Sequence, residues 1–383
     1  MRYTLDMDIS EQAIDLHKKL KGKIYTGLRG EVNEDTLPLF YSPGVAAASL
    51  YAKNDRTKLK EVAGTNNSVA VISDGSSVLG LGDIGPEGAM PVMEGKAMLF
   101  KHFADVDAVP IVLDVHTPDE IVAAVKAIAP SFGGINLEDI SAPKCFEIEE
   151  RLKDELDIPV MHDDQHGTAI VVLAGLINAA IVTGKEIGDM KIVMVGAGAA
   201  GVAIAKLISK YANPTIFAVD SKGVISKNRS DLNEEKKKLL DFTNKSDEGG
   251  SLADILAKGA DVFIGVSSAG ILTDQMVSSM GRDPIIFALA NPTPEIMPDL
   301  AKKAGACIVA TGRSDFPNQV NNSLGFPGIF RGALDNGVKR ITDDHKVAAA
   351  EALAALVETP TADKIIPNPF EPGIVDAIAA TIK

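Results

Sequence analysis

The chain has 383 residues, of which 46% are hydrophobic and 23% are charged. These proportions match soluble globular proteins and exclude a disordered chain, and the length allows two or three domains. The formal net charge of −14 argues against a protein that grips phosphate backbones, so we expect no nucleic-acid partner.

The cysteines and apolar segments indicate the compartment. Cys145 and Cys307 are the only cysteines and form no CxxC pair, so we expect a reducing environment without disulfides. The N-terminal residues lack the apolar block of a signal peptide. The longest apolar run, 169–182, contains Asn178 and is too short to span a membrane. We therefore expect a cytoplasmic protein with no membrane partner.

The first part of the chain predicts an α/β domain. A partial apolar stripe predicts a helix within the first 30 residues, and a short Ala-rich helix follows over 45–51. Further helices are expected around 93–103 and, after the N-cap Thr117, up to about 128. Apolar runs predict strands over 68–73, 108–115, 134–139 and 158–162.

A second α/β unit follows a bridging helix expected over 168–182. Its strands alternate with helices, among them 200–209 and a charged patch around 233–240, which implies a parallel sheet with right-handed crossovers. An Ala-rich helix from Asp344, an arm with several prolines and a final helix complete the chain. The predicted strands of this unit are 191–195, 215–220, 261–266, 285–290 and 307–310.

The turn Gly196-Ala-Gly-Ala-Ala-Gly201 follows the strand 191–195 and opens a helix. In this setting glycines let the backbone approach a pyrophosphate, and the helix N-terminus offers free amide groups to it. Asp220 ends the next strand, where a carboxylate would bind the ribose hydroxyls of NAD. Lys222 is close enough to tolerate a 2′-phosphate, so NAD is favoured and NADP stays open.

Two pairs of acids end short apolar strands 25 residues apart, Glu138-Asp139 and Asp163-Asp164. Carboxylates at strand ends, without cysteine or histidine at zinc spacing, suit Mg²⁺ or Mn²⁺. Adjacent acids on an extended chain point to opposite faces, so not all four need bind the ion. Capping or surface roles remain the alternative, and His162 and His166 are expected to be structural rather than ligands.

Tyr41 and Lys96 are the third group of candidate residues, although neither is informative by itself. Lys96 lies between the apolar segments 90–93 and 97–100. A lysine beside a desolvated metal pocket would have a lowered pKa and would act as a general base. Glu94 is a potential counter-charge that would oppose this lowering.

Together these segments resemble the malic enzyme family, in its short bacterial and archaeal form. The resemblance extends from about Tyr41 to Arg331 and is carried by several ordered motifs. The family oxidises (S)-malate with a nicotinamide cofactor and a divalent metal and then decarboxylates the oxaloacetate to pyruvate. The matching segments are Leu39–Val45, Ser73–Gly75, Leu79–Gly85, Gly134–Ile140, Val160–Thr168, Phe287–Thr293, Asn321-Asn322 and Phe326–Gly328.

The resemblance implies a role for each matching residue. Tyr41 corresponds to the general acid and Lys96 to the general base, which also touches substrate; Asp163 is a proton-relay candidate. Glu138, Asp139 and Asp164 correspond to the metal ligands, and Asn291, Asn321 and Asn322 to the substrate-binding amides. The implied cofactor residues are Gly196, Gly198, Ala199, Ala200, Gly201, Asp220, Gly265, Val266, Ser267 and Asn291.

The sequence departs from the family at one place. Many larger members carry an arginine for a substrate carboxylate just before the glycine-rich segment, where this chain reads Ser76-Ser77-Val78. Arg313 is one possible substitute. Three alternative functions also stay open: an oxaloacetate decarboxylase on the same scaffold, a malolactic-type enzyme that releases lactate, and a non-catalytic nicotinamide-binding protein.

The expected fold class is α/β, and the expected architecture has three parts. A substrate and metal domain covers residues 1–165, a Rossmann-type, doubly wound, parallel-sheet dinucleotide-binding domain covers 166–365, and a C-terminal arm covers 366–383. We expect the arm to pack on the first domain or on a neighbouring subunit. The apolar first helix and the proline-rich tail suggest a homodimer, and the resemblance makes an active site shared between subunits plausible.

Overall fold

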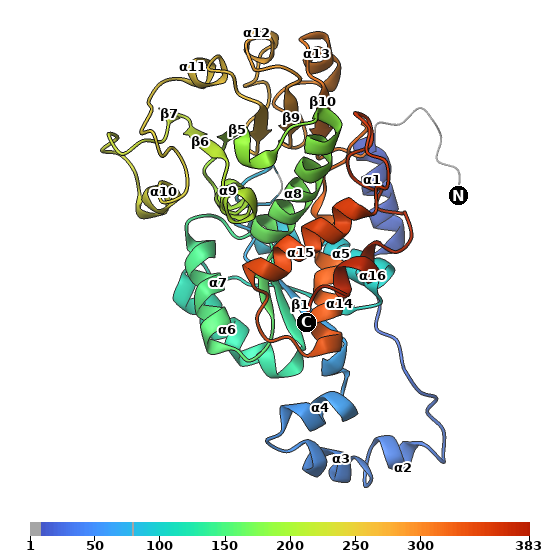
Figure 1. Cartoon of the computed structure of the whole chain (residues 1–383). Helices are drawn as coiled ribbons and strands as arrows, with labels where there is room; N and C mark the ends of the chain where they lie inside the picture. Colours follow the sequence, from blue (N-terminus) through green and yellow to red (C-terminus); the bar gives the residue numbers. More distant parts are fainter. Residues whose placement is uncertain (1–8, 79) are drawn as a thin grey trace.

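The computed structural model describes residues 9–78 and 80–383. Leu79 of the glycine-rich segment and the first eight residues, where the first expected helix and domain begin, lie outside the described residues. Two sheets lie in separate halves of the molecule, and the long helix α8 (Asp163–Thr183) runs between them (Figure 1). The predicted α/β class is confirmed.

The first half contains a four-stranded, wholly parallel sheet in the order β2-β1-β3-β4. Most residues of its strands are apolar, as expected where helices cover both faces of a parallel sheet. The bounds are β1 (Ser68–Ser73), β2 (Asp107–Val112), β3 (Gly134–Leu137) and β4 (Val160–His162), with helices α5 (Gly85–Ala104), α6 (Pro118–Ile128) and α7 (Lys144–Glu155) between them.

The second half contains a six-stranded sheet in the order β10-β9-β8-β5-β6-β7, parallel except for the β6–β7 pair. After β5 the chain adds β6 on one side of that strand and later adds β8 on its other side. The strand order reverses at this point, and α/β sheets bind their ligands in the loops next to such a reversal. The strands are β5 (Lys191–Val195), β6 (Thr215–Asp220), β7 (Gly223–Val224), β8 (Val262–Gly265), β9 (Ile285–Ala288) and β10 (Ile308–Thr311). The helices are α9 (Ala199–Ala212), α10 (Glu234–Leu239), α11 (Leu252–Leu256), α12 (Asp274–Ser278) and α13 (Pro298–Lys303).

One hydrophobic core extends from the first sheet through α8 to the second. By length and composition α8 could cross a membrane, but 72% of its most apolar window is buried inside the protein. Its burial is that of a core helix. Asn178, in the middle of α8, is itself buried and donates to the carbonyl oxygens of Ala354 and Ile365, both at 2.9 Å. It thereby ties the C-terminal segment to the core.

The C-terminal helices return to the first half of the molecule. In α14 (Phe326–Asn336), Phe326 and Phe330 pack edge-on against Phe100 of α5, with ring centroids 4.6 and 5.4 Å apart. A β-carbon added at Gly328 would lie 2.7 Å from Ile378, so glycine allows α16 (Ile374–Ala379) to pack closely on α14. The helix α15 (Asp343–Ala355) lies beside α8. The predicted domain boundary at residue 365 stays a prediction. Helix α14 belongs by that prediction to the second domain, yet it packs on α5 of the first half.

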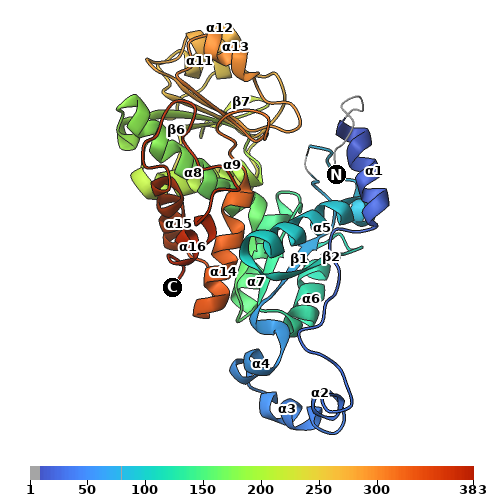
Figure 2. The ribbon, with the colours of Figure 1, turned by 90° about the vertical axis from the view of Figure 1, so that its right-hand side faces the viewer.

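An extended arm separates the first helix, α1 (Ile9–Leu20), from β1. It carries α2 (Leu37–Phe40), α3 (Val45–Ala52) and α4 (Arg56–Val62), and both views place α2 and α3 at one end of the molecule, away from α5 (Figures 1 and 2). Large apolar side chains on this arm are exposed, including Tyr25 (93%) and Leu39 (71%). We call the part of it that ends with α3, residues 25–52, the N-terminal arm.

Candidate active site

The glycine turn after β5 has the geometry that its sequence predicts. Gly196 has a φ of 112°, which L-residues rarely adopt, and a β-carbon on Gly201 would lie 1.8 Å from the carbonyl oxygen of Gly196. A β-carbon on Gly198, which precedes α9, would meet nothing within 4 Å. The turn therefore leaves open space at the start of α9, where a phosphate group would fit.

A pocket of about 810 Å³ opens at this turn, large enough for a nucleotide. Gly196, Gly198, Asp220 and Ser267 line it, which brings together cofactor residues predicted from three separate strands. Lys222 and Lys236 line the same pocket beside Asp220.

Lys96 lies in the first half of the molecule, on α5, and is 7% exposed. Its Nζ is 2.7 Å from Oε1 of Glu138 and 2.5 Å from Oδ2 of Asp163, and it lies 4.2 Å from the ring centroid of Phe326. Burial alone would lower the pKa of Lys96, but the two carboxylates outweigh it and raise the pKa. The expected lowering is therefore wrong, and the counter-charges are Glu138 and Asp163 rather than Glu94.

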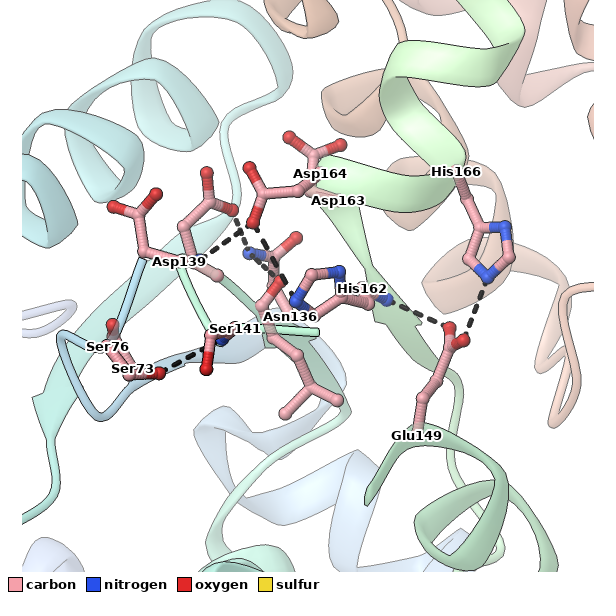
Figure 3. Close-up of polar contacts among 12 residues, drawn as sticks. Ser73, Ser76, Asn136, Asp139, Ser141, Glu149, His162, Asp163, Asp164 and His166 are labelled. Carbon is pink, nitrogen blue, oxygen red and sulfur yellow. Dashed lines mark hydrogen bonds and ion pairs between the residues drawn. The ribbon is translucent and has the colours of Figure 1, made fainter. Parts of the chain in front are cut away.

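Asp139, Asp163 and Asp164 gather at the ends of β3 and β4 (Figure 3). Glu138 follows β3 directly and shares the Lys96 ammonium group with Asp163. Oδ2 of Asp164 accepts a hydrogen bond from the backbone N–H of Asp139 at 2.8 Å. Asp139 has a left-handed φ of 54°, so the alternation of an extended strand ends there, and Glu138 and Asp139 are both 4% exposed. Non-glycine residues held in this conformation often mark functional sites.

The four acids of this cluster are paired with a single ammonium group, that of Lys96, which contacts Glu138 and Asp163. Burial raises the pKa of Glu138 well above its usual range, and the neighbouring carboxylates of Asp164, Asp163 and Asp139 raise it further against the opposing effect of Lys96. Burial likewise raises the pKa of Asp163. Within residues 9–78 and 80–383, no three His, Cys, Asp or Glu side chains are arranged so that they could hold one metal ion. The ammonium group of Lys96 is paired with two of the four acids.

The predicted substrate amides Asn322 and Asn291 each lie beside another part of the candidate site: Asn322 beside α8, and Asn291 beside the glycine-rich loop of the first half. A β-carbon on Gly167 would contact both Oδ1 of Asp163 and Cβ of Asn322, so Asn322 is next to the first turn of α8. A β-carbon on Gly80 would lie 2.2 Å from the carbonyl oxygen of Asn291, so the glycine-rich loop touches the end of the second sheet.

Three predicted residues lie elsewhere or are otherwise engaged. The Asn321 side chain accepts from the N–H of Ser323 at 2.9 Å and so caps a short 3₁₀ turn. Arg313 pairs with Asp315 at 2.7 Å and donates to the carbonyl oxygen of Pro292 at 3.0 Å. Tyr41 lies on the N-terminal arm between α2 and α3 and is 68% exposed. Figure 2 shows these two helices away from α5, the helix that carries Lys96.

Two buried glutamates support the site, and sequence reasoning missed both. Glu149 on α7 accepts from the backbone N–H of His162 at 2.9 Å and from Nε2 of His166 at 2.8 Å (Figure 3). Glu295 is fully buried and accepts from the N–H groups of Ser267 and Ala290, both at 3.0 Å. It therefore joins the loops after β8 and β9. An acid in a proline-rich turn is usually exposed, so the sequence carries no signal for this role.

The fold and the pocket define a two-part protein that binds a dinucleotide in one half and presents buried acids and a lysine in the other. Family models agree with this division: the malic enzyme N-terminal domain matches residues 17–119 and 116–153, and the malic enzyme NAD-binding domain matches 165–372.

Individual relatives match nearly the whole chain. The bifunctional malic/malolactic enzyme of Bacillus subtilis is 54% identical over 98% of this chain and 92% of its own length. The NAD-dependent malic enzyme of Geobacillus stearothermophilus is 50% identical over 98% of this chain and 78% of its own length. The crystal structure of an NAD-dependent malic enzyme from Thermotoga maritima superposes with a TM-score of 0.94, at 49% identity over 97% of this chain and 98% of that chain.

The chain belongs to the malic enzyme family and is an oxidoreductase. The predicted resemblance is thereby confirmed, as is the enzyme class.

Proposed function

We propose that this chain oxidises (S)-malate with NAD or NADP and decarboxylates the bound oxaloacetate to pyruvate. The observation that carries the proposal is the buried Lys96, whose Nζ lies between Glu138 and Asp163 at the edge of the first sheet. It is joined by the open glycine turn of the second sheet. The named activities of the Bacillus and Geobacillus relatives support the same reaction.

The acid cluster has the ligand chemistry of a divalent-cation site, although no three acidic side chains of the described residues surround one point as they stand. The carboxylates of Asp164, Asp163 and Asp139 all act on that of Glu138, while one ammonium group pairs with only two of the four acids. Among the described residues, Oδ1 of Asp163 is buried without a hydrogen-bond partner. Hard oxygen ligands and excess negative charge suit Mg²⁺ or Mn²⁺. We propose that Glu138, Asp139 and Asp164 hold the ion, which requires Glu138 to leave its ion pair with Lys96.

When bound, the cation supplies a Lewis acid for the hydroxyl oxygen of malate, and the nicotinamide supplies the hydride acceptor. Lys96 then receives the hydroxyl proton at Nζ, for which it must first give up a proton of its own. Oδ2 of Asp163 lies 2.5 Å from Nζ and is the nearest group that could take this proton. Because Glu138 and Asp163 raise the pKa of Lys96, we propose that the transfer follows the departure of Glu138 to the cation. The pair therefore shares one proton and acts as base and relay. We assign orientation of the substrate to Asn291 and Asn322, which lie beside the glycine-rich loop and the first turn of α8.

Tyr41 is the proposed general acid, and the N-terminal arm holds it away from Lys96 of its own chain. We propose a homodimer in which the arm of one copy brings Tyr41 to the other copy's Lys96. The exposed apolar side chains of the arm support this, since contiguous exposed apolar surface marks interaction sites. Tyr41 would there protonate C3 of enolpyruvate.

Coexpression of two inactive variants, Lys96→Ala and Tyr41→Phe, tests this sharing. If sites combine residues from two chains, each mixed dimer has one intact site, and a random mixture recovers about a quarter of wild-type activity. If both residues act within one chain, the mixture stays as inactive as its components.

The reaction itself is tested by mixing the protein with malate, Mn²⁺ and each nicotinamide cofactor. We expect reduced cofactor and pyruvate in equal amounts. Decarboxylation of oxaloacetate without malate oxidation would favour the decarboxylase alternative instead. Lactate without net cofactor reduction would favour the malolactic reaction, an activity that the name of the Bacillus relative includes.

A further inference from the structure

Asn136 is a buried polar residue within β3 to which the proposed reaction gives no role. It pairs in register with Val71 of β1 and Met161 of β4, and all three side chains are fully buried. Asparagine is depleted in strands, and burying an amide is costly unless its polar atoms are hydrogen-bonded. The position of Asn136 in this apolar layer therefore calls for a reason other than packing.

The hydrogen bonds of Asn136 lead to the acid cluster. Its Nδ2 donates to Oε2 of Glu138 at 2.9 Å, whereas its contact with the carbonyl oxygen of Leu137 is 3.5 Å long. Among the described residues, Oδ1 of Asn136 has no hydrogen-bond partner. Asn136 and Glu138 are two positions apart, so on an extended chain they share a face. The short bond of this buried amide therefore goes to a carboxylate that we assign to the cation.

The two oxygens of Glu138 are held by different partners. Oε1 pairs with Nζ of Lys96 at 2.7 Å, and Oε2 accepts from Asn136. When Glu138 leaves Lys96 for the cation, as proposed above, the bond from Asn136 can persist because it uses the other oxygen. The carboxylate would then keep Oε2 in place and present Oε1 to the ion. Hydrogen bonds of this kind orient the carboxylates that bind metal ions in proteins.

We infer that Asn136 is a positioning residue for the divalent cation: its amide holds Oε2 of Glu138 and leaves Oε1 to bind the ion. The inference rests on the proposed function, because it takes Glu138 to be a ligand of that ion. Without the amide, Oε2 loses its donor in a buried place and the side chain of Glu138 is free to rotate. Loss of such a partner lowers metal affinity by roughly 10- to 100-fold.

The test is the affinity of the full chain for Mn²⁺ alone, measured from the electron paramagnetic resonance signal of the free ion without malate or nucleotide. Asn136→Leu keeps the branching of the side chain and removes its donor. We expect the dissociation constant for Mn²⁺ to rise by about 10- to 100-fold in this variant.

Asn178→Leu is the matched control. Asn178 is also a buried asparagine, and its Nδ2 donates to the carbonyl oxygens of Ala354 and Ile365, in the C-terminal part of the chain. The control therefore loses buried hydrogen bonds without touching Glu138. We expect it to be less stable to urea than wild type and to bind Mn²⁺ with wild-type affinity.

Asn136→Ala, which adds no atom to the strand, takes the place of Asn136→Leu if leucine prevents folding. Wild-type affinity for Mn²⁺ in the folded variant would overturn the inference. An equal loss of affinity in Asn178→Leu would also overturn it, because the loss would then follow from reduced stability. If wild type itself binds no Mn²⁺, the cation assignment in the proposed function is wrong. A wild type and an Asn136 variant that bind Mn²⁺ equally well would refute only the role of Asn136.

Discussion

Glu295 gives a prediction whose size follows from the structure. The side chain is fully buried and accepts two backbone N–H bonds, from Ser267 and Ala290, each 3.0 Å long. Gly265 packs directly on it, since a β-carbon there would lie 2.4 Å from Cδ of Glu295. The glutamate therefore fixes two loops that we assign to the nicotinamide and the substrate.

Replacing Glu295 removes acceptors from buried donors. In Glu295→Gln the amide oxygen still accepts one hydrogen bond, but the amide NH₂ is a donor and faces the second backbone N–H. We therefore expect the free energy of unfolding to fall by about 2 kcal/mol. In Glu295→Ala both N–H groups lose their partner and a small cavity is added, so we expect about 4 kcal/mol. Urea unfolding followed by circular dichroism measures both, with Glu358→Gln, a change at an exposed glutamate, as the control.

The same residue predicts a pH dependence. Burial raises the pKa of Glu295 against the opposing effect of its backbone N–H donors. An acid with a raised pKa in the folded state stabilises the fold most when protonated, and this contribution is lost as the pH rises from the unfolded pKa through the folded one. Glu295→Gln should flatten that part of the stability profile. Unchanged stability together with unchanged affinity for NAD in Glu295→Gln would refute the positioning role.

Three further predictions concern the remaining groups of the site. Lys96→Ala should lower turnover by orders of magnitude while cofactor binding by calorimetry stays normal; near-normal turnover would remove Lys96 from the mechanism. Asp164→Asn should abolish most of the Mn²⁺-dependent rise in melting temperature, and an intact rise would place the ion elsewhere. Because the pKa of Asp220 is lowered to about 2, its stabilisation is present above its unfolded pKa and is lost as the pH falls from about 4 to about 2. Over that pH range the free energy of unfolding should therefore fall by about 1 kcal/mol less in Asp220→Asn than in wild type, after allowance for solvent screening. Equal decreases would contradict the ion pairs of Asp220 with Arg229 and Lys236.

The parts of the fold that local chemistry determines were predictable. Strands β1, β5 and β6 have the predicted bounds, because each is an apolar run closed by a turn or an acid. The turn at Gly196 also follows from the sequence, since positive φ and close backbone contact admit little but glycine. The helix α7, by contrast, was not predicted: its sequence is largely charged, and its apolar face is defined only by the sheet on which it packs.

The errors at the site arise where the answer depends on residues far apart in sequence. The apolar neighbours of Lys96 indicate its burial, but Glu138 and Asp163 follow it by 42 and 67 positions, and their charges reverse the direction of its pKa shift. Asp220 was predicted at the right strand end, yet Arg229 and Lys236 come from the following loop and helix, whose charge pattern is typical of solvated surface. Periodicity identifies which residues are buried and does not identify their ionic partners.

Tyr41 shows the same dependence at the level of the assembly. Its segment matches the family, and its local structure forms, since α2 and α3 flank it. Yet within one chain the arm leaves Tyr41 exposed, together with Leu39, Phe40 and Leu50. Covering this apolar surface would release free energy, which favours the proposed contact between two copies. The proposed general acid and the exposed apolar residues lie on the same short stretch of chain, so the proposed association of two copies would account for both.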